Sequence, residues 1–415
     1  MIEHAAKILM FVESTYPHDV RVNKEALALT RAGYSVMVIA IRGKDQKATE
    51  VVDGVMVYRI PRITLFQKTK GRNAGFVVRL VNGFTSIVGY AFEYLYFTTA
   101  TLFVSLYILM KRGFDIVHMN NPPDTLAVVG IFYKLFGKKY VFDHHDLSPE
   151  LYLTRVSGKK DIVYRSLLLF EKLSCKFADV IISTNESYRS IEINRHAVDP
   201  KKIYIVRNNP NFNGVIPGGK VEDNIKKNDK KTLLFLGSIN PQDGIDVLLQ
   251  VLYHLVHQLN EKNFTCNIVG GGDSLEPAIQ MAKEMELSDY LTFTGMIYDR
   301  EKVKEYLSSS DIGVEPAPLN DANEHSTFIK VMEYMAAGKP VVAFDLKETR
   351  FSADTAALLV PPDDVKGFAS AIKTLLKDPS LCRELGARGR QRIREELNWD
   401  KATTNLLKAY QSITR

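Results

Sequence analysis

Cysteine is scarce in this chain of 415 residues, which has only Cys175, Cys266 and Cys382, far apart in the sequence. An odd number of cysteines at these spacings fits neither a disulfide framework nor a zinc site. We therefore expect reduced thiols and a cytoplasmic protein. We also expect no cleavable leader, because the first apolar run reads directly as a strand.

Several phosphate-binding and metal-binding motifs are also lacking. No G-x-G-x-x-G follows the first predicted strand, and no G-x-x-x-x-G-K-[ST] occurs, which argues against sites for a dinucleotide and for a nucleoside triphosphate. A D-x-D motif, of the kind that carries Mg²⁺ with a nucleoside diphosphate, is absent as well. The sequence therefore predicts chemistry without a metal or another cofactor.

Charge is nearly missing between Leu80 and Met110, where Glu93 is the only charged residue. A run of this length could span a bilayer, which needs about 20 apolar residues. The strands expected before and after it belong to one sheet, however, so a single crossing would divide that sheet between two sides of the membrane. We therefore expect a long helix packed on the sheet, either wholly as core or with one face of the 76–112 region in a lipid interface.

Basic charge is concentrated in the first half of the chain. Residues 1–219 hold 29 Lys and Arg against 19 Asp and Glu, whereas the whole chain has 54 against 48. This excess fits a solvated surface, contact with an anionic membrane, or an acidic substrate. Nucleic acid is not an expected partner, because no recognition motif accompanies the charge.

Short strand-like runs alternate with helical runs along nearly the whole chain, which indicates an α/β architecture with parallel sheets. The alternation breaks at 208–231, which is rich in Asn, Gly, Pro and Lys and reads as a linker. We predict two Rossmann-like, doubly wound domains, 1–212 and 213–397, that face each other across a cleft, and a final helix at 398–415. Ligands of such sheets bind beyond the carboxyl ends of the strands.

The stretch 323–345 reads as a buried helix followed by a buried strand, yet Glu333 lies in the middle of that helix. Ser326 or Thr327 is a plausible N-cap, which places the N–H groups of the helix start at the carboxyl edge of the sheet, where they can bind phosphate. Lys330 can add a cation, and Glu333 can accept hydrogen bonds from a ribose or sugar hydroxyl. Alternatively, Glu333 pairs with a neighbouring helix or reaches solvent.

Two other strand ends carry loops that suit a ligand. The glycines of "IVGGGD" at 268–273 let the backbone approach a ligand closely, although many such loops are only tight turns. The run "FDHHDLSPE" places Asp143, His144, His145 and Asp146 at the end of a strand. Neighbouring residues there point in opposite directions, so the four cannot easily share one metal ion. Substrate contact by one histidine and a structural role are both open.

Several motifs together resemble family 4 of the retaining glycosyltransferases, which have the GT-B fold of two Rossmann-like domains: "YPHDVRVNKEALALTRAGYSVMVI", "YVFDHHDLSPELY", "LLFLGSINPQDGIDVLLQ", "IVGGGD" and "KVMEYMAAGKPVVAFD". The resemblance covers essentially the whole chain, and "EYMAAGKPVV" is its most specific element. It implies that Glu333 holds the ribose of a nucleotide sugar, that His145 approaches the donor sugar, and that the last helix packs on the first domain. It also implies further donor contacts at Gly237, Ser238, Gly271, Gly272, Met296 and Ile297, and an acceptor side with His18, Arg21 and Asp146.

One departure from the family pattern concerns the donor sugar. The family usually has two acidic residues eight positions apart, whereas His325 stands eight positions before Glu333, with Glu324 beside it. Either Glu324 or His325 could therefore meet the donor sugar.

A second departure concerns the diphosphate. The family usually carries an Arg and a Lys after the first strand of the second domain, where this chain has Ser238 and Asp243. Lys330, Arg207 or the helix start at 326–327 must then bind the diphosphate, or donor binding is weak or lost.

The sequence as a whole predicts a retaining, metal-independent glycosyltransferase of the hexosyl or N-acetylhexosaminyl type. Its donor would be a nucleoside diphosphate sugar, with a UDP-sugar expected first, and its acceptor a lipid-linked or polysaccharide component of a cell-surface glycan such as capsule, O-antigen or exopolysaccharide. We expect the basic first domain and the 76–112 region to touch an anionic membrane at its cytoplasmic face. The alternatives are a nucleotide-sugar epimerase or hydrolase and a non-catalytic protein that binds a partner or a glycan.

Overall fold

The computed structural model describes residues 6–63, 76–156, 158–210 and 230–414. The chain forms two compact units: unit 1 consists of Met1–Pro149, Lys159–Val206 and Thr403–Arg415, and unit 2 of Glu150–Gly158 and Arg207–Ala402. The predicted boundary at residue 212 lies outside the described residues, and the arrangement of two domains across a cleft stays a prediction.

Unit 1 is built on an eight-stranded sheet in the order β3-β4-β2-β1-β5-β6-β7-β8. Every neighbouring pair is parallel except β3 and β4, which form a hairpin. All seven strands predicted in this half are present, and the short edge strand β3 was not predicted because Asp53 and Gly54 are its only clear turn signal. The strands are β1 (Lys7–Thr15), β2 (Ser35–Ile41), β3 (Thr49–Val52), β4 (Val55–Ile60), β5 (Ile116–Asn120), β6 (Lys139–His144), β7 (Val180–Ser183) and β8 (Ile203–Ile205).

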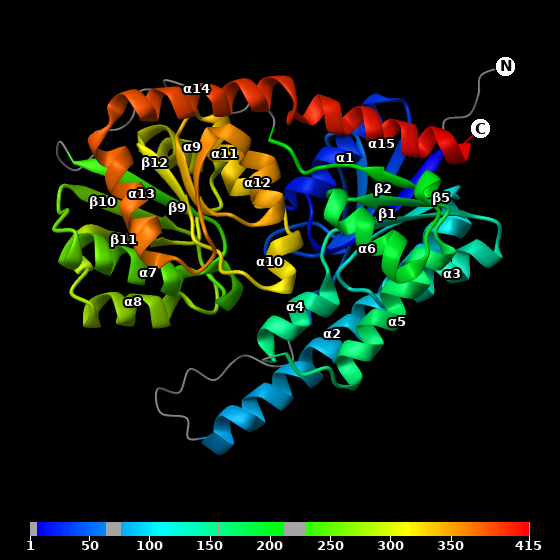
Figure 1. Cartoon of the computed structure of the whole chain (residues 1–415). Helices are drawn as coiled ribbons and strands as arrows, with labels where there is room; N and C mark the ends of the chain where they lie inside the picture. The colour runs from blue at the N-terminus through cyan, green and yellow to red at the C-terminus, as the bar shows by residue number, and fades with distance from the viewer. Residues whose placement is uncertain (1–5, 64–75, 157, 211–229, 415) are drawn as a thin grey trace. The chain divides into compact units, whose positions relative to one another are not determined.

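Helices connect these strands and cover the sheet (Figure 1). They are α1 (Val20–Arg31), α2 (Phe76–Lys111), α3 (Leu126–Leu135), α5 (Ile162–Phe177), α6 (Glu186–His196), the 3₁₀ turn η1 (Pro200–Lys202) and α15 (Trp399–Thr414). Polar side chains start three of them, because Asp19, Asp161 and Asn185 each accept hydrogen bonds from backbone N–H groups of the first turn of α1, α5 and α6. On one face of the sheet, α2 and α3 pack against β1 through fully buried side chains such as Phe97, Tyr133 and Phe11.

The long apolar helix α2 joins two strands of the same sheet, since it follows β4 and precedes β5. Its part from Phe92 to Lys111 is long and apolar enough to cross a membrane by length and composition, with a mean hydropathy of 1.3. A single crossing would separate β4 from β5, so the shared sheet agrees with the prediction of a helix packed on the sheet. One face of α2 is core, with Phe97 and Ile108 fully buried, whereas Phe103 is 67% exposed.

Unit 2 is built on a six-stranded, all-parallel sheet in the order β11-β10-β9-β12-β13-β14. The six strands predicted for this half are all present: β9 (Lys231–Leu236), β10 (Phe264–Val269), β11 (Leu291–Gly295), β12 (Ile312–Glu315), β13 (Val341–Phe344) and β14 (Ala357–Val360). Alternate residues of β9 enter different cores, with Leu233 and Phe235 in one and Leu234 and Leu236 in the other. Both faces of this sheet are therefore covered, as in a doubly wound fold.

Helices fill the connections of unit 2 (Figure 1). The α-helices are α7 (Ile245–Tyr253), α8 (Leu275–Glu284), α9 (Arg300–Ser309), α10 (Asp321–His325), α11 (Ile329–Ala336), α12 (Lys347–Ala353), α13 (Val365–Lys377) and α14 (Pro379–Glu395). Helix α4 (Ser148–Arg155) lies between β6 and β7 in the chain, and most of its residues are grouped with unit 2. The shorter elements are η3 (Pro241–Asp243), the π-turn η4 (His254–Gln258), η5 (Ser288–Tyr290) and η6 (Asp354–Ala356). Helix α11 lies against β12, where the Tyr334 ring covers Gly313 so closely that a Cβ there would lie 2.3 Å from the ring.

Candidate functional site

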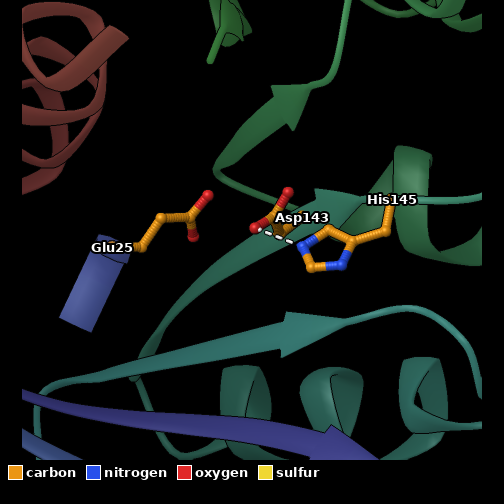
Figure 2. Close-up of side chains that lie close together, drawn as sticks. All are labelled: Glu25, Asp143 and His145. Atoms are coloured by element: carbon orange, nitrogen blue, oxygen red, sulfur yellow. Dashed lines mark hydrogen bonds and ion pairs between the residues drawn. The ribbon is translucent and has the colours of Figure 1, made fainter. Parts of the chain in front are cut away.

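His145 follows β6 at the carboxyl edge of the sheet of unit 1. Its backbone N–H donates to Asn121 Oδ1 at 2.7 Å, and the Asn121 amide donates to the carbonyl of Asp146 at 2.8 Å, so one side chain anchors this loop. The imidazole Nε2 of His145 lies 2.9 Å from Asp143 Oδ2 (Figure 2). The His145 side chain is 15% exposed, whereas Asp143 is completely buried. The loop therefore holds His145 at the edge of the sheet with one ring nitrogen fixed.

Asp143 is the centre of a buried ionic cluster that includes Arg21 and Glu25 of α1. Arg21 Nη2 lies 2.6 Å from Asp143 Oδ1, and Arg21 Nε lies 3.3 Å from Glu25 Oε1. Burial alone would raise the pKa of Asp143, but the charges of Arg21 and His145 lower it well below its ordinary value. Burial and then the charge of Asp143 raise the pKa of Glu25 well above its ordinary value. Asp143 is thus the ionised partner of Arg21, whereas burial beside Asp143 disfavours the charged form of Glu25.

The cluster has a superficial likeness to a metal site. Glu25, Asp143 and His145 each offer one ligand atom, and these atoms lie within 4.8 Å of one another. The guanidinium of Arg21, however, already neutralises Asp143 and sits where a cation would be repelled. His144 cannot join them, because its Nδ1 bonds Glu192 Oε1 at 2.9 Å in a separate buried pair. This donor set fits an ion-pair cluster better than a divalent metal.

The three residues predicted for the acceptor side lie in different environments. His18 is exposed in the turn after β1, and Asp146 is partly exposed after His145. Burial raises the pKa of Asp146, against the lowering effect of His145. Arg21 is only 6% exposed and is fully engaged with Asp143 and Glu25. Arg21 therefore holds Asp143 in position and does not lie on the open surface, where an acceptor could contact it.

Glu13 is a further polar group near the carboxyl end of β1. Burial, followed by the charge of Glu93 on α2, raises its pKa to about 7, while Arg62 lowers it. Sequence analysis missed this grouping, because the three residues come from three separate elements.

In unit 2, the loops that follow β9, β10 and β11 meet at the carboxyl edge of the sheet and are joined by backbone hydrogen bonds. Gly237 N–H donates to Val269 O at 3.0 Å, and Gly270 N–H donates to Gly295 O at 3.1 Å. Gly271 is buried beside Met296, with which an added Cβ would make ordinary contact at 3.4 Å. The structure therefore brings the predicted donor residues Gly237, Ser238, Gly271, Gly272, Met296 and Ile297 to one edge of the sheet.

Lys330 lies beside the first of these loops, and its ammonium group is paired with a carboxylate that the sequence analysis did not single out. Lys330 Nζ lies 3.0 Å from Glu315 Oε2 at the end of β12, and both side chains are buried. It also lies over the Phe235 ring, 4.3 Å from the centroid. Burial raises the pKa of Glu315, and Lys330 lowers it. Asp243 accepts a hydrogen bond from Asn240 N–H at 2.9 Å and so closes the turn η3. This position, where the family usually has a cation, therefore has a structural role in the turn.

Helix α11 begins later than predicted. Its first residue is Ile329 and its N-cap is Phe328, which provides no side-chain cap. The expected cap Ser326 instead donates its hydroxyl to Ala322 O at 2.7 Å and so closes α10. Thr327 Oγ1 accepts a long hydrogen bond of 3.4 Å from Arg207, whose guanidinium also pairs with Glu348 at 3.0 Å. The prediction of a helix N-terminus at Ser326 or Thr327 is therefore wrong.

The acidic and imidazole side chains of the predicted donor site lie on α10 and α11. Glu333 is partly exposed in the middle of α11. Glu324 Oε2 accepts from Lys347 N–H at 3.3 Å, at the start of α12. His325 Nδ1 donates to Asp321 O at 2.7 Å. The individual roles of these three side chains stay predictions.

A hollow of about 590 Å³ lies next to the Met296–Asp299 loop of unit 2. Its walls come from the edge strand β11, that loop and α9, and they mix rings, hydroxyls and charges: Thr292, Thr294, Met296, Ile297, Tyr298, Asp299, Lys302, Glu305 and Tyr306. Its volume lies within the range of small-molecule sites.

Comparison with known proteins accounts for both halves of the chain. Residues 20–209 match the model of Glycosyltransferase Family 4, and residues 230–378 match that of Glycosyl transferases group 1. The human alpha-1,3/1,6-mannosyltransferase ALG2 is 25% identical over 338 residues, which cover 76% of this chain and 77% of that protein. Phosphatidyl-myo-inositol mannosyltransferase of Mycolicibacterium smegmatis is 32% identical over 187 residues, which are 44% of this chain and 46% of that protein.

The fold is shared with solved structures as well. Sucrose-phosphate synthase from Thermosynechococcus elongatus superposes with a TM-score of 0.74 over 98% of this chain and 99% of that one, at 19% identity. The two parallel-sheet α/β units therefore agree with the two family matches. The chain belongs to the family 4 and group 1 type of glycosyltransferases with the GT-B fold, enzymes that use a nucleotide sugar as donor.

Proposed function

We propose that this protein transfers a hexosyl residue, with retention of configuration and without a metal ion, from a nucleoside diphosphate sugar to a lipid-linked or polysaccharide acceptor of a cell-surface glycan. The observation that carries the proposal is the group of loops at the carboxyl edge of the sheet in unit 2, next to Glu333. UDP is the nucleotide predicted from the sequence. Mannose is the first sugar to test, because several relatives are named as mannosyltransferases.

The donor would bind unit 2 through its nucleoside diphosphate. The backbone of Gly271 and Gly272 can approach the diphosphate closely, and Glu333 can accept hydrogen bonds from the ribose hydroxyls. The base would lie near Met296 and Ile297, at the hollow described above. Because these contacts involve only the nucleoside diphosphate, the anomeric carbon of the sugar would stay accessible to the acceptor hydroxyl.

Chemistry at the sugar would need little from protein side chains. In the same-face route implied by the family, the leaving diphosphate accepts the proton of the acceptor hydroxyl. The protein then orients both substrates and stabilises the developing charge. His145 would approach the donor sugar in this scheme.

We also propose that unit 1 contacts the cytoplasmic face of an anionic membrane, where a lipid-linked acceptor is found. The exposed side of α2 carries Leu95, Phe103 and Met110, which are 62%, 67% and 78% exposed. Their spacing of seven or eight residues places them on one side of the helix. Lys111 and Arg112 follow directly and can meet anionic headgroups.

Replacing Leu95, Phe103 and Met110 together by serine should weaken binding to vesicles by at least about tenfold, because each exposed apolar side chain contributes roughly 1.5 kcal/mol or more when it enters lipid. Flotation with phosphatidylglycerol-containing vesicles measures the effect. Leu319→Ser is the matched control, since Leu319 is 49% exposed in unit 2. Equal flotation of the triple variant and the wild type would argue against contact through α2.

Calorimetric titration with UDP, GDP and ADP tests the donor site. We expect about micromolar binding of one nucleotide and a loss of roughly tenfold to a hundredfold in Glu333→Ala, because a hydrogen bond to a charged group contributes roughly 1.5–3 kcal/mol. Glu301→Ala is the control, as Glu301 lies on the exposed surface of α9. If the wild type binds one of the nucleotides and Glu333→Ala binds it equally well, Glu333 does not hold the ribose.

A non-catalytic role is the second candidate, and the diphosphate side of the loop after β9 favours it. Ser238 is exposed there and Asp243 is negatively charged, whereas the family usually has two cations. Lys330 and Arg207, the possible substitutes, are paired with Glu315 and Glu348. If none of the three nucleotides binds the wild type, this role becomes the better account of the chain.

A further inference from the structure

A continuous chain of hydrogen bonds runs from the last helix of the protein to His145. The hydroxyl of Tyr410 on α15 lies 2.5 Å from His118 Nδ1, and His118 Nε2 lies 3.2 Å from Asp143 Oδ2. The same carboxylate oxygen lies 2.9 Å from His145 Nε2. Tyr410, His118 and Asp143 are fully buried, and all four residues belong to unit 1. Only the last member of the chain reaches the surface.

The partners of His118 determine its protonation. Its Nε2 faces oxygen acceptors of Asp143 and Asn120, each at 3.2 Å, and of Glu25 at 3.7 Å. The amide of Asn120 donates to Phe11 O, which fixes Oδ1 as the atom that faces the ring. Nε2 must therefore carry hydrogen, and in the Nε2–H tautomer Nδ1 accepts a hydrogen bond from the hydroxyl of Tyr410. Burial raises the pKa of Tyr410 well above its ordinary value, so this donor stays protonated.

The same reasoning applies to His145. Its Nε2 points at the ionised carboxylate of Asp143, so Nε2 carries hydrogen, and in the Nε2–H tautomer Nδ1 is the ring nitrogen left to accept a hydrogen bond. Asp143 holds that ring with an oxygen that it shares with His118. A change in the hydrogen bond from His118 therefore changes the charge and position of the atom that orients His145.

We propose that Tyr410 and His118 are positioning residues, which act through Asp143 to hold His145 in the Nε2–H tautomer with Nδ1 directed to the donor sugar. The proposal rests on the proposed function for its last step, the contact of His145 with the sugar. It gives α15 a role in the site, because this helix supplies the hydroxyl at the start of the chain. The arrangement resembles other buried networks in which a carboxylate fixes the tautomer of a histidine.

Histidine-selective ¹⁵N NMR on the full-length protein tests the network without any ligand. The nine histidines can be labelled together, and His118→Gln and His145→Gln identify the two sets of ring signals. We expect the Nε2–H pattern for both rings in the wild type. Tyr410→Phe removes only a hydroxyl group and should shift the ring signals of both His118 and His145. Tyr34→Phe is the matched control, because the Tyr34 ring lies 5.6 Å from that of Tyr410 but takes no part in the chain.

Two results would overturn the proposal. One is a Tyr410→Phe spectrum in which the His118 signals move and those of His145 do not, because the chain would then end at Asp143. The other is an Nδ1–H pattern for His145 in the wild type. Asp143→Asn should disturb the His145 signals more strongly, but it removes the ionised partner of the buried Arg21 and can fail to fold, so Tyr410→Phe is the decisive variant.

The link to catalysis is tested separately, with the nucleotide sugar whose nucleotide binds in the titration above. Turnover of that donor by Tyr410→Phe should show kcat about tenfold lower with an unchanged KM for the donor, a loss in the range seen for indirect partners of histidines. An unchanged kcat, despite shifted His145 signals, would overturn the step from His145 to the sugar. Absence of any nucleotide binding, in contrast, would count against the proposed function and leave the NMR result valid.

Discussion

Replacing Gly270 by alanine is expected to unfold unit 2 or to lower its free energy of unfolding by more than about 4 kcal/mol. Gly270 has φ of +151°, where side chains are rarely accommodated, and an added Cβ would lie 1.7 Å from the carbonyl oxygen of Gly237. No side-chain rotation relieves this overlap, because both groups are backbone. Urea unfolding followed by circular dichroism measures the loss.

Gly295→Ala is the matched control for this prediction. Gly295 has φ of +71° and an added Cβ would meet nothing within 4 Å, so only the backbone preference is lost, at about 1–2 kcal/mol. Both glycines belong to the same group of loops, since Gly270 N–H donates to Gly295 O. Equal unfolding midpoints for the two variants would show that the close approach of the backbones at Gly237 is not required.

The same close approach matters for function. The strand ends of β9 and β10 must lie side by side if the loops that follow them are to present backbone N–H groups to one diphosphate. Gly271→Ala separates folding from binding, because its Cβ would meet Met296 at 3.4 Å, an ordinary contact. If Gly271 approaches the diphosphate as proposed, Gly271→Ala should weaken nucleotide binding in calorimetric titration and leave the free energy of unfolding almost unchanged.

The sequence was sufficient for every strand of both sheets except the short edge strand β3, because the apolar runs of the other strands are continuous and bounded by turn residues. It was insufficient for the start of α11, because the Ser326 hydroxyl can either accept from a backbone N–H of a following helix or donate to a carbonyl of the preceding one, and only the folded chain selects Ala322 O. Local capping rules describe a helix in isolation and do not include the helix that precedes it.

The cluster around Asp143 was also beyond the sequence analysis, although signals were present. Glu25 interrupts the apolar stripe of α1, and His118 lies in the middle of a fully buried strand. A charged or titratable residue at such a position needs a buried partner. Which partner it finds depends on the order of strands in the sheet and on α15, and neither follows from local pattern.

The second large effect is expected at Lys330. Lys330→Met should lower the free energy of unfolding of unit 2 by about 3–5 kcal/mol, because it leaves the buried carboxylate of Glu315 without its partner. Glu315→Gln should cost a similar amount, and the double variant should recover much of the loss. Lys231→Met is the control, since its pair with Asp311 is partly exposed and contributes about 1 kcal/mol or less.

The loss in Lys330→Met should depend on pH. Burial raises the pKa of Glu315, and removing Lys330 removes the main influence that lowers it. A carboxyl group with a raised pKa in the folded state binds more protons there than in the unfolded state, so stability falls as pH rises. The deficit should therefore be larger at pH 8 than at pH 5, and the double variant with Glu315→Gln should lack this slope. A deficit that is constant with pH would show that lost packing, and not the unpaired carboxylate, is responsible.

These variants also decide whether Lys330 serves the donor. Its ammonium group lies beside Gly237, where an added Cβ would be 3.5 Å from Nζ, at the edge where the diphosphate is expected. If Lys330 binds the diphosphate, Lys330→Met weakens nucleotide binding, whereas Glu315→Gln strengthens it, because the cation is then free of its internal partner. If Lys330 is only structural, both variants lose stability and bind the nucleotide as the wild type does. The two variants should therefore change nucleotide affinity in opposite directions if Lys330 binds the diphosphate, although both lower the free energy of unfolding. Measuring affinity and stability on the same two variants separates the two roles.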